Sequence, residues 1–129
     1  MAVKVGTTTV IDDSFKLQNI AGANGRYDNF QANVSTLTSS SSVAVSMDKP
    51  FMQLAMASNA TLDLQDLAAG KTSILALDTS TNAWTPSFSS NVEWAEDAEP
   101  VWTDYRYWNI AFVSWDASVV RAAAIGFNS

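Results

Sequence analysis

The sequence contains no cysteine and no histidine. Without cysteine, neither a disulfide nor a thiolate metal site can form, so packing and backbone hydrogen bonds must hold the fold, as suits assembly in a reducing cytoplasm. The absence of histidine as well excludes Ser-His-Asp and Cys-His catalytic groups and zinc sites built on imidazole. The five glycines lie singly, so there is no glycine-rich phosphate loop. We therefore expect a protein that is not an enzyme and carries no cofactor.

Basic residues are also scarce, with 7 Lys and Arg against 13 Asp and Glu, for a net charge of −6. Such a balance repels phosphate backbones and anionic lipid surfaces, so we expect neither nucleic acid nor a membrane as partner. Apolar runs long enough for a signal-peptide core or a membrane span are missing too. We expect a soluble protein that is not exported by that route.

The chain is long enough for one domain, with 129 residues of which 47% are hydrophobic. Apolar residues alternate with polar ones at Val43–Met47, Met52–Met56 and Thr61–Leu64, which is the two-residue period of a half-buried strand. Turn-forming residues at Asp48–Pro50 and Ser58–Ala60 separate these segments. Three strands joined by short turns are therefore predicted.

Further strands are predicted at Lys71–Leu77 and at Tyr105–Trp115, the latter rich in aromatic and β-branched residues. Asp116–Ser118 then links Tyr105–Trp115 to Val119–Phe127 as a hairpin. No window keeps a helical period for three turns.

Gln65–Ala69 could form at most one helical turn before Gly70 ends it. We therefore expect an all-β protein, with residues 26–129 forming an antiparallel β-sandwich or barrel-like domain.

Residues 1–25 look different, because glycines and polar residues break their apolar positions into pieces too short to form a core. This pattern is typical of an extended N-terminal arm that docks on another surface. The alternative is a first edge strand of the same domain. The docking residues of such an arm would be Val3, Val5, Val10, Ile11, Phe15, Leu17 and Ile20.

The segment Asn91–Trp102 concentrates carboxylates and indoles. Paired acids beside tryptophan suggest glycoside hydrolysis, which needs two carboxyl groups fixed in a rigid cleft. Noncatalytic contact with a glycan is a second interpretation. The third, which we favour, is an acidic surface loop whose like charges spread into solvent while its tryptophans anchor it to the core. The residues concerned are Glu93, Trp94, Glu96, Asp97, Glu99 and Trp102.

Asp78–Asn82 has oxygen ligands at alternate positions, as at the start of a calcium-binding loop. Ala83 stands where such a loop needs glycine, however, and Ser89 where it needs glutamate. We therefore predict no metal site here.

Five segments follow one another in the order Asn59–Leu64, Gly70–Asp78, Phe88–Trp94, Glu99–Pro100 and Asn109–Asp116. Read in this order, they resemble a β module of bacteriophage tail-fibre proteins. Separately, Val5–Ile20 resembles a leader found in tail fibres of aquatic phages. The chain departs from the module at Ala95–Glu99, usually rich in glycine, and at Asn109, usually aspartate, so no specific contact is carried over there.

The resemblance implies a noncatalytic virion protein that assembles in the host cytoplasm and lies on the virion surface. Since a fibre is normally much longer, we expect a capsid decoration protein that contacts phage capsid or tail proteins. The alternative is a short tail fibre or adaptor that binds a host-surface glycan. Such proteins are commonly trimers, so the resemblance also implies a homotrimer, whose closed symmetry would bury sheet edges.

Overall fold

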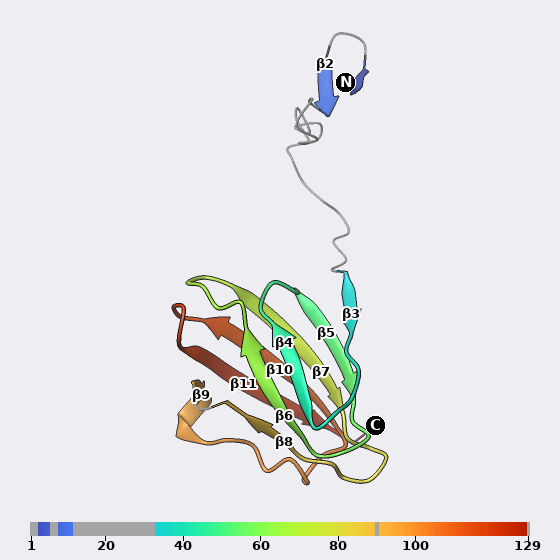
Figure 1. Cartoon of the computed structure of the whole chain (residues 1–129), viewed down its shortest axis with the longest axis vertical. Coiled ribbons are helices and arrows are strands. Elements are labelled where there is room, and N and C mark those ends of the chain that lie inside the picture. The colour runs from blue at the N-terminus through green and yellow to red at the C-terminus, as the bar shows by residue number, and fades with distance from the viewer. Residues whose placement is uncertain (1–2, 6–7, 12–32, 90, 129) are drawn as a thin grey trace. The chain divides into compact units, whose positions relative to one another are not determined.

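The computed structural model describes residues 3–5, 8–11, 33–89 and 91–128 (Figure 1). The chain divides into two units, Met1–Gln31 and Ala32–Ser129. We call the second unit the β domain. Its strands are β3 (Val34–Thr36), β4 (Ser42–Ser46), β5 (Phe51–Ala55), β6 (Ala60–Gln65), β7 (Thr72–Asp78), β8 (Pro86–Phe88), β9 (Val92–Trp94), β10 (Tyr107–Ser114) and β11 (Val120–Phe127).

The protein is all-β, as predicted. The only helical segment in the described residues is η2 (Ala95–Asp97), a short 3-10 turn. The helical turn considered for Gln65–Ala69 does not form, because Gln65 ends β6 and a bend and a turn follow. Gly70 in that turn has a φ of 87°, which glycine adopts without steric cost, and its N–H donates to the Ser114 carbonyl.

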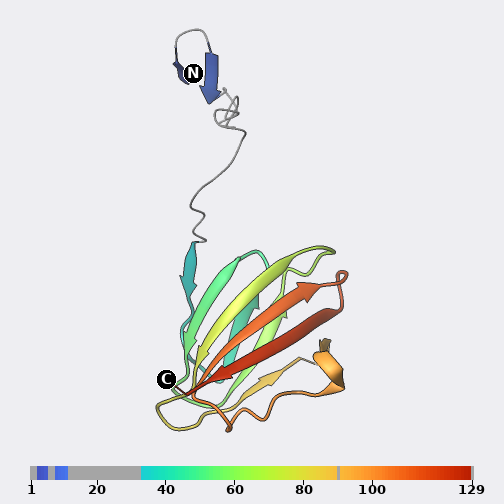
Figure 2. The same cartoon turned by 180° about the vertical axis from the view of Figure 1, so that it is seen from behind.

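The strands of the β domain form a six-stranded sheet in the order β3-β5-β7-β10-β11-β9 and a three-stranded sheet in the order β4-β6-β8. From β3 to β8, successive strands alternate between the two sheets, so neighbours within each sheet are parallel. Only the β7–β10 and β10–β11 pairs are antiparallel, while β9 joins β11 in parallel. Figures 1 and 2 show the two sheets from opposite sides. The prediction of antiparallel pairing is therefore correct for the β7–β10 and β10–β11 pairs and wrong for the other strand pairs of the two sheets.

The physical reason lies in the connections. Asp48–Pro50 turns the chain as expected, but it leads from β4 in one sheet to β5 in the other. The next connection returns to β6, which already begins at Ala60, a residue predicted to lie in the turn. Successive side chains point to opposite faces in parallel and antiparallel strands alike, so a two-residue period does not show which sheet a strand joins.

The inward side chains of both sheets share one hydrophobic core. Burying one such aliphatic or aromatic side chain contributes about 1.5 to 3 kcal/mol. Fully buried members come from the three-stranded sheet, such as Val45 and Leu62, and from the six-stranded sheet, such as Leu75, Ile110 and Phe112. The predicted alternation is therefore confirmed in β4, β5 and β6, where every second residue is buried. The same pattern is found in β7 and β10, which were predicted only as strands.

In the first unit, β1 (Val3–Val5) and β2 (Thr8–Ile11) pair as an antiparallel hairpin. Four of the predicted docking residues, Val3, Val5, Val10 and Ile11, lie in these two strands. Phe15, Leu17 and Ile20 lie outside the described residues.

Candidate interaction surface

The acidic segment lies on the surface of the β domain. Glu93 is in β9, Glu96 and Asp97 are in η2, and Glu99 follows it; all four side chains are exposed. Glu96 and Asp97 both have positive φ, of 60° and 55°, a backbone conformation that is uncommon for residues other than glycine. The structure thus brings these residues together as a surface loop.

The two tryptophans of this segment point the other way. Trp102 is only 6% exposed, and its indole N–H donates to Glu99 Oε1 at 3.0 Å. Its ring contacts Trp94 and Trp108 edge to face, at centroid distances of 5.6 and 4.9 Å. Phe88 contacts both Trp94 and Trp102. The loop is therefore anchored to the core through its indoles, as expected, and the Trp102 ring cannot serve as a platform for a sugar.

Glu93 has a partner that sequence reasoning missed. Its Oε2 accepts from Arg121 Nε at 3.2 Å, although no basic residue lies near Glu93 in the chain. Parallel pairing of β9 with β11 places these residues side by side. Both side chains are more than half exposed, so the pair contributes at most about 1 kcal/mol.

The feature that the sequence analysis missed is the outer face of the six-stranded sheet, the face turned away from the core. Figure 2 views the domain from this side, with β7, β10 and β11 in front. The outward residues on these strands are mostly apolar. They are Thr72, Ile74, Ala76 and Asp78 on β7, Tyr107, Asn109, Ala111 and Val113 on β10, and Arg121, Ala123, Ile125 and Phe127 on β11.

Large side chains on this outer face are well exposed. Ile125 is 65% exposed, Val113 44% and Ile74 42%. On β3 and β5, Val34 and Phe51 continue the row that Ile74 begins. Strands with apolar side chains on both faces are usually buried on both faces. The sequence signal was available in runs such as Ile110–Val113, where outward as well as inward residues are apolar.

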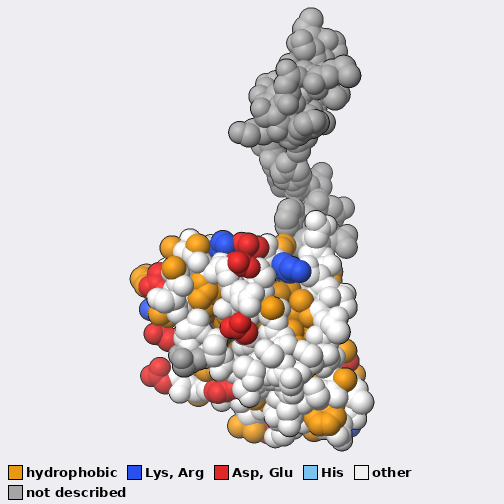
Figure 3. Space-filling view, viewed as in Figure 1, with side chains coloured by type: hydrophobic (Ala, Val, Ile, Leu, Met, Phe, Trp, Pro, Cys, Tyr) orange, Lys and Arg blue, Asp and Glu red, His pale blue; other side chains and the backbone are white. Residues whose placement is uncertain are grey.

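The three-stranded sheet provides a contrast within the same domain. Its outward residues are almost all polar, including Ser42 on β4, Thr61, Asp63 and Gln65 on β6, and Ser87 on β8. Figure 3 shows this side of the domain, mostly white, with red carboxylates and separate groups of orange apolar side chains. One sheet therefore has the outer surface expected for solvent contact, and the other does not.

Two shallow depressions lie on the outer face, where its side chains are small. One, of about 380 Å³, is lined by Ala111, Ala123 and the ion-paired Glu93 and Arg121, among others. The other, of about 360 Å³, is lined by Ala55, Ala76 and Tyr107, among others. On the central strands β7, β10 and β11, the outward charged residues lie only at the ends, with Asp78 at one end and Arg121 at the other.

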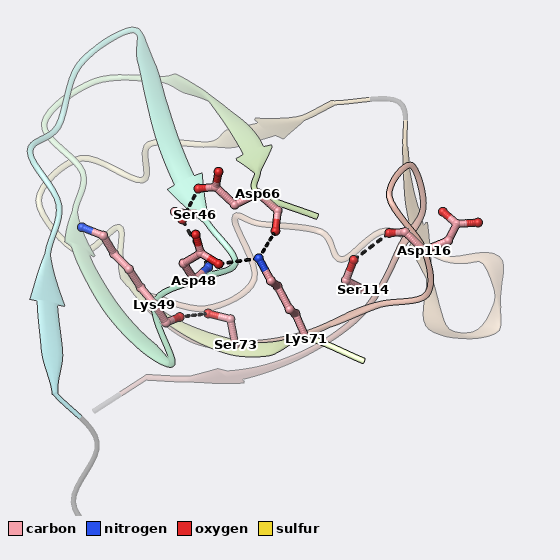
Figure 4. A network of polar contacts seen from close by, with 8 residues as sticks. All are labelled: Ser46, Asp48, Lys49, Asp66, Lys71, Ser73, Ser114 and Asp116. Carbon is pink, nitrogen blue, oxygen red and sulfur yellow. Dashed lines mark hydrogen bonds and ion pairs between the residues drawn. The ribbon is translucent and has the colours of Figure 1, made fainter. Parts of the chain in front are cut away.

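A polar cluster ties together three turns at one end of the β domain (Figure 4). The Lys71 ammonium forms an ion pair with Asp48 and donates to the Asp66 carbonyl at 2.7 Å. Ser46 donates to the Asp66 carboxylate, and Ser73 Oγ donates to the Lys49 carbonyl at 2.6 Å. This cluster holds the β4–β5, β6–β7 and β10–β11 ends of the sheets in place. The last is held because the Ser114 N–H donates to the Lys71 carbonyl and the Gly70 N–H donates to the Ser114 carbonyl.

Asp116 organises the turn of the β10–β11 hairpin. Its Oδ1 accepts from the N–H of Ser118 at 2.7 Å, from the Ser118 hydroxyl at 3.0 Å and from the N–H of Val119 at 2.8 Å. These hydrogen bonds favour the carboxylate, the Ser118 N–H foremost, and lower the pKa of Asp116 below its usual value of 3.8. The carboxylate therefore stabilises the turn, and its hydrogen-bond partners lie within that turn.

The segment compared with a calcium loop also forms a turn. Asp78 Oδ1 accepts from the Ser80 N–H at 2.8 Å, and Thr79 is buried. Over residues 33–89 and 91–128, no three acidic side chains come together in a way that could hold a metal ion. No helix in the described part of the chain is long and apolar enough to cross a membrane.

Comparison with known proteins found no relative of this chain. No protein-family model matches the chain. No curated protein matches it. No solved structure matches it. The class that the structure defines is therefore an all-β domain with one polar and one apolar sheet surface.

Proposed function

We propose that this chain is a noncatalytic structural protein of a bacteriophage particle, most simply a decoration protein on the capsid surface. The observation that carries the proposal is the apolar outer face of the six-stranded sheet, with Ile74, Val113 and Ile125 each more than 40% exposed. A contiguous apolar surface of this kind marks protein contact. The phage assignment itself depends on the resemblance to tail-fibre modules.

In this proposal, the β domain is a β-sandwich of the two sheets, preceded by an N-terminal arm. Two observations support the sandwich: the two sheets share one core, and each has its own outer surface. The arm would dock on the shell through Val3, Val5, Val10, Ile11, Phe15, Leu17 and Ile20, while the β domain contacts other copies of the chain. Location on the virion surface follows from this role, after assembly in the host cytoplasm.

The acidic carboxylates have structural partners that suit a noncatalytic role. Glu99 accepts from Trp102, and Glu93 pairs with Arg121. Both acids are exposed, whereas a glycosidase holds its acid pair in a cleft that separates the behaviour of the two carboxyl groups. If the purified protein releases no sugar from a panel of bacterial polysaccharides, the noncatalytic proposal stands; hydrolysis that disappears in E93Q or E99Q would refute it.

Electron microscopy of particles tests the placement. Particles that lack the protein are incubated with gold-labelled full-length chain, and label is expected over the capsid. The matched variant lacks residues 1–25 and is expected to keep the near-ultraviolet circular dichroism of the β domain but to lose binding. Label only at the tail would refute the decoration role, and a deletion that unfolds the domain would show that these residues are an integral part of it.

The alternative function, as a tail adaptor that contacts host glycan, is favoured by one observation. The depression of about 380 Å³ combines carboxylates of the acidic loop with Arg121 and the edge of Trp94, the mixture of polar groups and ring that sugars bind. A glycan array with the wild-type chain and an Arg121→Ala variant tests it. Binding that is lost in the variant would support the adaptor function, and an array without any binder would rule it out.

A further inference from the structure

The sizes of the side chains on the outer face follow a regular pattern. In one row across the sheet, Ile74 of β7 lies beside Ala111 of β10 and Ala123 of β11. In the next row along the strands, Ala76 lies beside Asn109 and then Ile125. Large and small residues thus exchange places between β7 and β11 from one row to the next.

This arrangement is complementary to itself. When a second copy is stacked face to face about a two-fold axis parallel to β10, residues on β7 of one copy lie over residues of the same row on β11 of the other. Ile74 then lies over Ala123 of the partner copy, and Ile125 over Ala76 of the partner copy. Stacked sheets lie about 10 Å apart, which suits an isoleucine opposite an alanine better than two isoleucines or two alanines.

The polar residue in the middle of the face fits the same axis. Asn109 on β10 lies opposite itself, so the two amides can donate to and accept from each other. An axis perpendicular to β10 that also sets isoleucine opposite alanine must run between the two rows. It would place Asn109 against Ala111 and leave a buried amide without a partner, at a cost of about 1 to 3 kcal/mol. The parallel axis is therefore preferred.

The distribution of charge also allows two copies to meet at this face. The β domain carries ten Asp and Glu against four Lys and Arg over residues 33–128, so two copies repel through most of their surface. Between β7 and β11 the face holds only Asp78 and Arg121, at opposite ends. About the axis parallel to β10, Asp78 lies over Phe127 of the partner copy and Arg121 over Thr72 of the partner copy, so like charges do not meet.

We propose that the outer face of the six-stranded sheet binds a second copy of this chain as a two-fold symmetric, face-to-face dimer. An isologous interface requires one self-complementary surface, which the exchange of Ile and Ala provides. The proposal deepens the assembly function proposed above and names the occupant of the face. It replaces the three-fold contact that the resemblance implies with a two-fold contact at this surface.

Sedimentation equilibrium of the full chain is the first test, with twice the chain mass of 13.9 kDa expected. A size exchange then tests the pattern itself. Ile125→Ala and Ala76→Ile are each expected to raise the dimer dissociation constant about tenfold or more, because each change occurs twice in the interface. The double variant I125A/A76I restores one large residue opposite one small residue and is expected to recover most of the affinity.

A matched charge pair separates this contact from general apolar adhesion. Ile125→Glu is expected to give monomers, whereas Thr61→Glu adds the same charge to the outer surface of the three-stranded sheet and is expected to leave the dimer intact. The absence of cysteine allows an independent readout. Asn109→Cys should be linked into dimers by a short bismaleimide, and Ser87→Cys should not.

A monomer at about 100 µM, far above a typical micromolar dissociation constant, would overturn the dimer. So would a trimer whose mass is unchanged by I125E, or a size exchange in which the double variant is no better than the single ones. Each of these outcomes concerns chain association in solution. Failure of the virion role would instead appear as absence of label on the particle, so the two proposals can fail separately.

Discussion

The ring of Tyr105 lies directly against the backbone of Gly126, in the position where a β-carbon would otherwise stand. A Cβ built on Gly126 would lie 2.3 Å from Tyr105 Cδ2 and 2.4 Å from its Cγ. Gly126 is paired with Trp108 across the β10–β11 ladder, and Tyr105 contacts the Trp108 ring edge to face at 5.3 Å. The missing side chain of one strand therefore makes room for an aromatic contact that closes the end of the core.

Gly126→Ala should destabilise the β domain by about 1 to 3 kcal/mol, because the new methyl group displaces the Tyr105 ring and breaks its contact with Trp108. Alanine is otherwise tolerated in a strand at least as well as glycine, so the expected effect is steric. Urea unfolding followed by tryptophan fluorescence measures the change. A Cβ on Gly126 would also lie 2.8 Å from Tyr105 Cβ, so the control background is Tyr105→Gly, which removes all three close atoms. In that background the same substitution should cost almost nothing; an equal loss in both backgrounds would show that the Tyr105 contact is not its cause.

The two buried indoles of the aromatic cluster differ in one respect that can be measured. Trp102 Nε1 donates to Glu99, whereas Trp108 Nε1 is buried without an acceptor in the described part of the chain. Trp102→Phe removes a hydrogen bond, while Trp108→Phe removes an unpaired donor. We expect the first substitution to destabilise by about 1 kcal/mol more than the second.

Chemical denaturation of the two variants and of Glu99→Ala provides the comparison. Glu99→Ala should destabilise the wild type, because it leaves the Trp102 N–H buried and unpaired, but should have little effect in the Trp102→Phe background. Glu96→Ala makes the same charge change beside it and serves as the control. If E99A and E96A cost the same, the hydrogen bond does not contribute to stability.

Much of the strand pattern follows from the sequence, and the reason is local. Alternation in Val43–Met47 and Met52–Met56 predicts which residues point inward, since a strand places successive side chains on opposite faces. The hairpin of β10 and β11 is also predictable, because its turn residues Asp116–Ser118 lie between two long apolar runs. These features depend only on residues close together in the chain.

The sheet assignment could not be predicted, because it depends on partners far apart in sequence. A short turn such as Asp48–Pro50 can close a hairpin within one sheet or lead the chain across the core to the other sheet. The pairing of β4 with β6 and of β5 with β7 is decided by packing of both sheets on a shared core. Parallel neighbours result without any change in the period of the sequence.

The candidate surface was missed for a related reason. Ile74 and Ile125 are distant in the chain. They lie on the same sheet face only because β7 and β11 both pair with β10, which lies between them. The acidic loop, by contrast, is a local cluster and is easy to recognise. Its tryptophans were correctly expected to point to the core, but the Arg121 partner of Glu93 is visible only from the β9–β11 pairing.

Asp116 predicts how stability depends on pH at the hairpin turn. Its pKa in the folded protein lies below the unfolded value of 3.8, because the carboxylate accepts hydrogen bonds from Ser118 and Val119. Its contribution is therefore fully present above pH 3.8 and is lost as the pH falls through the lower, folded pKa. Asp116→Ala should be less stable than wild type at pH 7, and the difference should shrink on acidification below 3.8.

Thermal unfolding of wild type and D116A at a series of pH values between about 2 and 7, which spans the titration of an aspartate, checks this dependence. Asp116→Asn keeps an acceptor oxygen but has no titrating group, so its stability relative to wild type should also fall at neutral pH and converge in acid. D104N makes the same change at another bend of the chain and supplies a control. A gap between D116A and wild type that stays constant with pH would exclude a role for the ionised form.

The Lys71 ammonium contacts two turns, the one between β4 and β5 and the one between β6 and β7. It contacts Asp48 and the Asp66 carbonyl, and Asp66, with a φ of 58°, is held in turn by Ser46. Lys71→Met keeps the apolar stem and removes the charge, so it should destabilise by about 1 kcal/mol through loss of these bonds. Lys49→Met makes the same charge change with an ammonium that points away from the cluster in Figure 4, and should have almost no effect.

The effect of K71M should also depend on salt. Because the Asp48 contact is partly exposed, about 1 M NaCl should reduce this effect. It should not abolish it, since the hydrogen bond to the Asp66 carbonyl is not screened in the same way. Urea unfolding of both variants at low and high salt measures this, and amide hydrogen exchange should show faster opening at the β4–β5 and β6–β7 turns in K71M alone. Equal effects of K71M and K49M would mean that general charge, and not this cluster, sets the stability of that end of the sheets.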